Sequence, residues 1–394
     1  MRWFFGTAGV FMWFALLMGS VSAQRTNITN IDASLRESIG EIDKRPVVAP
    51  QATALKRPSA AADQSRADGT LPGRDQLNNG TVTIITAPVG GAYAAMGSDM
   101  AAVLDDGDKL RVLPMIGKGS AQNLIDILRL RTVDMGFALS DAVEFVKTEY
   151  SVPNLESRVN YITKVFNADF HILARKEIRT VRDLEGKKVF AERNLAYASL
   201  RNLFNRLHIT ADIDNKTDDV AGIQKVLSGE GDAWFGPIGK VAPLFRNIKN
   251  DEGRFHLVAI PYDKAIQDLY FPSAFTNADY PNLVAPGETV DTVAVSSLLM
   301  VYNWPVGTDR YNRVAKFVNA LFGRFDLLLQ PGRHPKWRET SLSATVPGLQ
   351  RFKAAETWLA QANGVQAAES KNLREADKAQ LYNEFLEWRR RFNR

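Results

Sequence analysis

Small, hydroxylated and acidic side chains follow three short apolar runs, and they are the residues of this chain best suited to hold a small molecule. The runs cover residues 81–86, 110–116 and 135–139 and have the β-branched, apolar character of buried strands. A turn follows each run, and apolar residues at helical spacing follow the first two turns. The candidate ligand-binding residues in and after these turns are Thr86, Gly91, Tyr93, Ser120, Asn123, Ser140 and Asp141.

Three successive strand–turn–helix units predict an α/β fold with a mainly parallel sheet and with these turns along one edge. Ligands of such sheets bind beyond the carboxyl ends of the strands, where helix N-termini offer N–H groups and partial positive charge. We therefore expect Ser120 to cap its helix and to hold a carboxylate together with nearby N–H groups. Asp141 would suit an amino or hydroxyl group of the ligand. The alternative is that Ser120 and Ser140 only cap helices and that the glycines only form turns.

The composition excludes several kinds of site. The chain has 394 residues, enough to bury a sizeable core and to divide into two lobes. Its net charge of +5 is modest, and no basic run with interleaved aromatic residues predicts nucleic-acid binding. The chain contains no cysteine, which excludes disulfides, thiolate metal sites and a lipidated cysteine. The four histidines lie far apart without metal-ligand spacing, so we expect neither a metal nor a cofactor.

The turn motifs and their order resemble those of the TAXI family, the extracytoplasmic solute-binding subunits associated with TRAP transporters. The similar motifs are Gly90-Gly91-Ala92-Tyr93, Gly119-Ser120-Ala121-Gln122-Asn123-Leu124, Val133-Asp134-Met135-Gly136 and Ser140-Asp141, within a resemblance that covers roughly residues 80 to 325. The resemblance implies a two-lobed periplasmic binding protein, type II-like, with mainly parallel sheets, a hinge and a ligand cleft between the lobes. It also implies a monomer that captures a small organic anion, either a carboxylate or an amino acid, for a TRAP-type membrane permease subunit.

The same resemblance implies that the chain crosses twice between the lobes. Residues 80–172 and 293–394 would form the first lobe, including C-terminal helices, and residues 173–292 would form the second. One turn of the second lobe departs from the family pattern. Relatives usually carry a glycine- and serine-rich turn there, whereas this chain has Leu195-Ala196-Tyr197-Ala198 after Glu192. The side chains of Arg193, Asn194 and Tyr197 are expected to replace the missing backbone contacts to the ligand.

The N-terminal residues have the pattern of an export signal. Arg2 precedes an apolar run from Trp3 to Met18, and Val21-Ser22-Ala23 forms a small–x–small cleavage site. We therefore expect residues 1–23 to be a cleaved signal peptide and the protein to act in the periplasm; the alternative is an uncleaved membrane anchor. Residues 24–79 are rich in alanine, proline, glutamine and charge, which predicts a disordered linker.

Two alternatives to a transport protein stay open from the sequence. A periplasmic sensor would bind a ligand in the same way and signal to a membrane receptor without transport. An enzyme could use Asp141 or Glu192 as an acid or base. General acid–base catalysis would need a partner group with a tuned pKa, and the sequence contains no Ser–His–Asp, metal or nucleotide motif that would supply one.

Overall fold

The structure is a computed structural model that describes residues 78–363 except 108 and 251. The predicted signal peptide, nearly all of the predicted linker and residues 364–394 of the predicted C-terminal helices lie outside the described residues. Within the described part of the chain, no helix is both long and apolar enough to cross a membrane.

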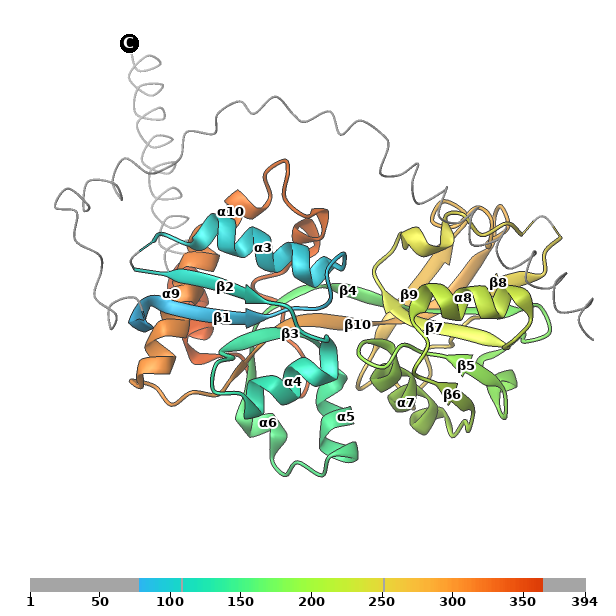
Figure 1. Cartoon of the computed structure of the whole chain (residues 1–394), viewed down its shortest axis with the longest axis horizontal. Coiled ribbons are helices and arrows are strands. Elements are labelled where there is room, and N and C mark those ends of the chain that lie inside the picture. Colours follow the sequence, from blue (N-terminus) through green and yellow to red (C-terminus); the bar gives the residue numbers. More distant parts are fainter. Residues whose placement is uncertain (1–77, 108, 251, 364–394) are drawn as a thin grey trace, which may run out of the picture. The chain divides into compact units, whose positions relative to one another are not determined.

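The described strands form one mixed sheet in the order β2-β1-β3-β10-β4-β7-β5-β6 (Figure 1). At one end of this sheet, β1 pairs in parallel with both β2 and β3. At the other end, β5 pairs in parallel with both β6 and β7. The bounds of these strands are β1 Thr81–Ile85, β2 Arg111–Met115, β3 Met135–Leu139, β5 Lys188–Phe190, β6 Asp212–Asp214 and β7 Ala233–Ile238.

Two long antiparallel strands, β4 (Val159–Arg175) and β10 (Thr289–Tyr302), run through the middle of the sheet and join its two ends. The second half of β10 pairs with β3, and the second half of β4 pairs with β7. We term the part built around β1–β3 the first lobe and the part built around β5–β7 the second lobe. The two-lobed α/β fold predicted from the sequence is confirmed, with the parallel strands confined to the two ends of the sheet.

Helices cover both faces of the first-lobe strands. One cluster of buried side chains joins α3 and α9 to alternate residues of the strands, such as Val82, Ile84 and Val112. The second cluster joins α4 and α5 to residues of the opposite face, such as Ile85 and Ala138. This alternation follows from the two-residue period of a strand. The helices of this lobe are α3 (Ala92–Leu104), α4 (Ser120–Arg129), α5 (Ala142–Glu149), α6 (Leu155–Arg158), α9 (Asp309–Gly323) and α10 (Phe325–Leu328).

The second lobe contains α7 (Ala196–Leu207) and α8 (Asp219–Ser228), with the short strands β8 (Phe255–Leu257) and β9 (Phe271–Thr276) pairing with β4 and β10. Its aromatic core surrounds His171, which is buried and stacks on Phe275 with ring centroids 4.3 Å apart. The His171 Nε2 atom lies 2.7 Å from the Tyr280 hydroxyl. Burial lowers the pKa of His171 to about 3, so this histidine is a neutral part of the core.

The lobe boundaries predicted at residues 172/173 and 292/293 fall inside β4 and β10. Both strands continue without interruption through these positions. The boundaries therefore remain predictions, and the described connection between the lobes consists of two continuous strands.

Candidate ligand site between the lobes

The side chain of Asn123 connects the first-lobe turns that were predicted to form the site. Its Nδ2 atom donates to the carbonyl of Thr86 after β1 (2.6 Å) and to the carbonyl of Phe137 in β3 (2.8 Å). Its Oδ1 atom accepts from the N–H of Gly119 (3.0 Å). Asn123 is completely buried, and these three bonds use both of its N–H groups and its carbonyl oxygen. The side chain of Asn123 therefore fixes the spacing of the carboxyl ends of the strands.

The predicted cap at Ser120 is wrong. Helix α4 has Gly119 at its N-cap position, with φ of 101°, and no side chain caps it. A side chain is strained at this φ, so the turn depends on glycine at residue 119. The hydroxyl of Ser120 instead accepts from the N–H of Leu139 at the end of β3 (3.2 Å), and Ser120 is completely buried. Ser120 thus connects α4 to β3, and its role toward a ligand remains a prediction.

Asp141 stands at the N-cap position of α5, but its side chain does not cap that helix. Its carboxylate is completely buried and lies against the second lobe. The hydroxyl of Tyr270 donates to Asp141 Oδ2 (3.2 Å), and Asn202 Nδ2 of α7 donates to the Asp141 backbone carbonyl (2.8 Å). The other carboxylate oxygen, Oδ1, has no hydrogen-bond partner among the described residues.

Burial raises the pKa of the Asp141 carboxyl group to about 6. The hydroxyls of Ser199 and Tyr270 oppose this shift only in part. Ser199 lies close enough to lower the pKa of Asp141, yet its Oγ atom is buried and completes no hydrogen bond within the described part of the chain. Asp141 Oδ1 and Ser199 Oγ come from different lobes and lie close together, and neither forms a hydrogen bond to any third group within the described part of the chain.

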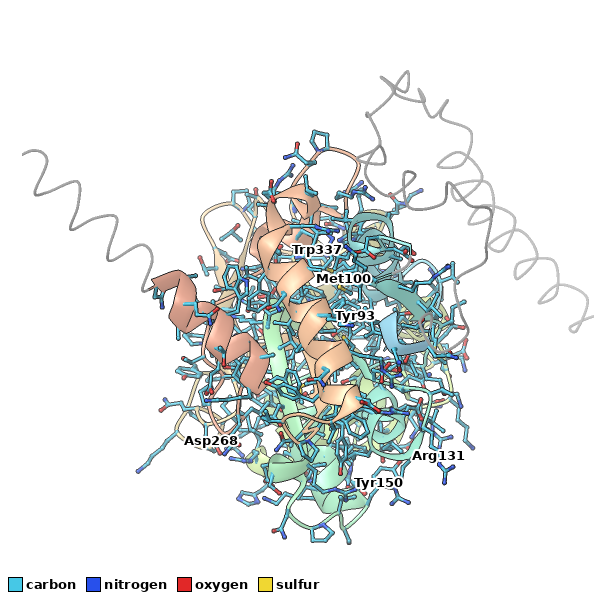
Figure 2. All side chains as sticks on the ribbon, turned by 90° about the vertical axis from the view of Figure 1, so that its left-hand side faces the viewer. Tyr93, Met100, Arg131, Tyr150, Asp268 and Trp337 are labelled. Carbon is cyan, nitrogen blue, oxygen red and sulfur yellow. The ribbon has the colours of Figure 1, made fainter. Side chains whose placement is uncertain are left out.

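Tyr93 lies inside the first lobe, at the centre of the view in Figure 2. Its ring stacks on Phe137 with centroids 4.8 Å apart, and its hydroxyl accepts from Ser297 Oγ of β10 (3.0 Å). Burial is the main cause that raises the pKa of Tyr93 well above its ordinary value, and the nearby Asp141 carboxylate adds to it. Tyr93 therefore belongs to the buried surroundings of Asp141.

The divergent turn of the second lobe is organised by Glu192. One of its carboxylate oxygens accepts from the N–H groups of Asn194 (2.9 Å) and Leu195 (3.0 Å), and the other accepts from Asn194 Nδ2 (2.5 Å). The predicted contact residue Asn194 is thus bound to its own turn, and Arg193 is exposed. The ring of Tyr197 packs edge-on against Phe145 of α5, with centroids 5.9 Å apart.

The side chain of Leu195 covers the start of α4. A Cβ atom added at Gly119 would lie only 2.7 Å from Leu195 Cδ2, so the leucine packs directly on the glycine backbone. An ion pair between Arg201 of α7 and Glu149 of α5 joins the lobes nearer the surface (3.2 Å). In this structure the two lobes therefore touch across the predicted site.

Thr86 and Gly91 lie at a different hollow, on the first lobe. It has a volume of about 420 Å³ and is lined mainly by small and apolar side chains, including Val89 and Ile116, with His334 at one side. Thr86 Oγ1 donates to the carbonyl of Met115 (2.9 Å), so its hydroxyl is already bound. The predicted site residues are thus divided between this hollow and the contact region of the lobes.

Ser140 is half-buried, and its N–H donates to the carbonyl of Ser296 in β10 (2.8 Å). Three polar residues beside Asp141 were missed by the sequence reasoning: Ser199, Asn202 and Tyr270. The two α7 residues lie within an amphipathic helix, and Tyr270 lies in a loop 129 residues away from Asp141. Their contact with Asp141 is set by the packing of the lobes.

The sequence matches no protein-family model and no curated protein, but its fold is similar to solved structures. The periplasmic VFT2 domain of Bordetella pertussis BvgS is 12% identical, with 68% of this chain and 95% of that chain covered and a TM-score of 0.37. The GluR0 ligand-binding core in complex with L-glutamate is 12% identical, with coverage of 62% and 92% and a TM-score of 0.36. The alkanesulfonate-binding protein SsuA from Xanthomonas axonopodis pv. citri, bound to MOPS, is 14% identical, with coverage of 66% and 81% and a TM-score of 0.36.

Proposed function

We propose that this protein is an extracytoplasmic solute-binding protein that closes its two lobes around a small organic molecule. The observation that supports this most is the buried pair Asp141 Oδ1 and Ser199 Oγ, on opposite sides of the lobe contact, which bond to no third group among the described residues. A buried polar group without a partner costs about 1–3 kcal/mol, so such a pair is expected where a ligand supplies the missing bonds.

The connection between the lobes suits such a closing motion. Two strands, β4 and β10, link the lobes, and contacts such as Tyr270 to Asp141 form only when the lobes meet. A ligand that contacts both lobes would shift the balance between open and closed forms toward the closed form. Opening would expose the carboxyl ends of β1 and β3 to solvent.

The resemblance to the TAXI family supports a more specific role. In this proposal the protein acts in the periplasm, after removal of residues 1–23, and delivers its ligand to a TRAP-type membrane permease subunit. Among the ligands that the resemblance suggests, the Asp141 carboxylate would favour an amino acid over a carboxylate that has no amine. A mature N-terminus at Gln24, found by mass spectrometry of periplasmic material, would support export; full-length protein confined to membranes would argue for an anchor.

The geometry favours binding over catalysis. Both carboxylate oxygens of Glu192 accept hydrogen bonds within its own turn, which leaves this group poorly placed to exchange protons with a substrate. Among the described residues the acid that hydrogen-bonds Asp141 is Tyr270, and burial raises the pKa of its hydroxyl well above the ordinary value, which makes it a poor proton donor or acceptor in catalysis. Thermal-shift screening of the protein against carboxylates, amino acids and amines tests the proposal, because a ligand of the folded state raises the melting temperature by mass action. A complete screen without any stabilising compound would count against a solute-binding role.

A further inference from the structure

We propose that the site recognises an ammonium group, held by Asp141 and Ser199, and that the start of α4 does not receive a carboxylate. This inference rests on the proposed function and specifies the class of ligand. It reverses the expectation that the helix N-terminus at Ser120 is the main recognition point. The ligand class is therefore an amine, with or without further polar groups.

The charge of the buried Asp141 carboxylate is not compensated within the described part of the chain. Among the described residues, no lysine, arginine or histidine forms an ion pair with this carboxylate, although it is completely buried. Buried carboxylates are normally paired with a cation or saturated with donors. Tyr270 donates to Asp141 Oδ2, and the nearby Ser199 hydroxyl lowers the pKa of Asp141, but both groups are neutral. An ammonium group would supply the missing positive charge.

The hydroxyl of Ser199 lies beside the Asp141 carboxylate. An ammonium group has three N–H donors and no acceptor, so it needs several acceptors that converge on it. Asp141 Oδ1 and Ser199 Oγ come from different lobes, and both are buried and bond to no third group in the described part of the chain. Together they offer one charged and one neutral acceptor. A carboxylate placed there would instead face Asp141 with like charge.

The start of α4 is already packed and bonded. The N–H of Gly119 donates to Asn123, and the completely buried hydroxyl of Ser120 is turned toward β3, where it accepts from the N–H of Leu139. Leu195 from the second lobe packs on Gly119, so an apolar side chain closes over this turn when the lobes meet. A carboxylate held here in the closed form would have to displace Leu195. The divergent turn therefore makes Leu195 a determinant of specificity.

The test uses pairs of compounds that differ in an amine: succinate and aspartate, glutarate and glutamate, propionate and alanine, with putrescine as an amine without a carboxylate. Thermal shift and calorimetry on the whole chain would measure binding of each compound. We expect stabilisation by amine-bearing compounds only. The variant Asp141→Asn should weaken the binding of the best amine by roughly tenfold or more, because a charge-assisted hydrogen bond is lost.

The matched control is Asp268→Asn, which removes an exposed carboxylate that binds Arg206 near the lobe contact. This variant should bind the best amine as the unaltered protein does. A carboxylate without an amine that binds as tightly as its amine-bearing partner would overturn the inference and leave the proposed function standing. Unchanged affinity in Asp141→Asn would also overturn it. Failure of every compound of both classes to bind would count against the proposed function itself.

A second variant, Leu195→Ala, separates the two halves of the proposal. Shortening this side chain opens the space over Gly119, so compounds with a carboxylate should gain affinity while putrescine does not. Equal effects on putrescine and on aspartate would show that Leu195 does not control access to the start of α4. That result would contradict its role in specificity.

Discussion

The hydroxyl of Tyr270 donates to Oδ2 of Asp141 over 3.2 Å, and this bond joins the loop before β9 in the second lobe to the end of β3 in the first. Both groups are buried. The bond brings together residues that are 129 positions apart in the sequence. This hydrogen bond can therefore form only when the two lobes are in contact.

Replacing Tyr270 by phenylalanine should favour the open form. The change removes a hydrogen bond to a charged group, worth about 1.5–3 kcal/mol, and keeps the ring that packs on Phe170. Small-angle scattering of the ligand-free variant should give a larger radius of gyration than the unaltered protein. The control is Tyr262→Phe, at a partly exposed ring. An unchanged radius in Tyr270→Phe would mean that this bond does not hold the lobes together.

The pKa of Asp141 predicts how stability depends on pH. Burial raises this pKa from 3.8 to about 6, so the folded protein binds the proton more tightly than the unfolded chain does. The stabilising contribution is fully present below about pH 4 and is lost as pH rises through about 6, at a total cost of about 3 kcal/mol. The groups that face Asp141 are hydroxyls and an amide, from Tyr93, Ser199, Asn202 and Tyr270.

Asp141→Asn should remove this penalty. Its free energy of unfolding at pH 7.5 should exceed that of the unaltered protein by about 2–3 kcal/mol, even though it binds amines less well. Urea denaturation between pH 4 and 8 would measure the difference. Part of the pH dependence should persist in the variant, because burial also raises the pKa of Asp219 to about 6. A variant that is less stable than the unaltered protein at every pH would contradict the assignment.

Asn123→Ala should destabilise the first lobe strongly. It leaves two buried carbonyls and the N–H of Gly119 without their partner, and the expected loss is about 3 kcal/mol or more in the free energy of unfolding. Gln122→Ala is a matched control on the same helix. It removes only a bond to Asp126, four residues along the helix, and should cost about 0.5 kcal/mol or less. Similar losses for both variants in urea denaturation would refute the structural role of Asn123.

Ser120→Ala distinguishes the ligand role expected from the sequence from the structural role. If Ser120 held a carboxylate, affinity would fall roughly tenfold to a hundredfold. Since its hydroxyl binds the N–H of Leu139, we expect a loss of about 1–3 kcal/mol in stability and an affinity for amines within about twofold of the original. Calorimetry and urea denaturation on the same preparation decide between them.

The sequence predicted the features that depend on local patterns. The strands before Thr86 and Ser140 and the turn at Gly119 were predicted from apolar periodicity and glycine, and the two-lobed α/β fold was predicted with them. The cap at Ser120 was predicted wrongly, because a positive φ at Gly119 moves the helix start and turns the hydroxyl toward β3. The neighbours of Asp141 could not be predicted. Tyr270 and Ser199 reach it through the packing of two lobes, which leaves no local pattern in the chain.

The most direct test of the account is the distance between the lobes with and without ligand. The chain has no cysteine, so spin labels can be placed at Tyr150→Cys in the first lobe and Val220→Cys in the second, both at exposed positions. Electron–electron double resonance would then give the distribution of distances between the labels. We predict a broad distribution without ligand that shifts to its shorter distances when a stabilising amine saturates the protein. A distribution that does not change at saturation would contradict closure of the lobes around the ligand.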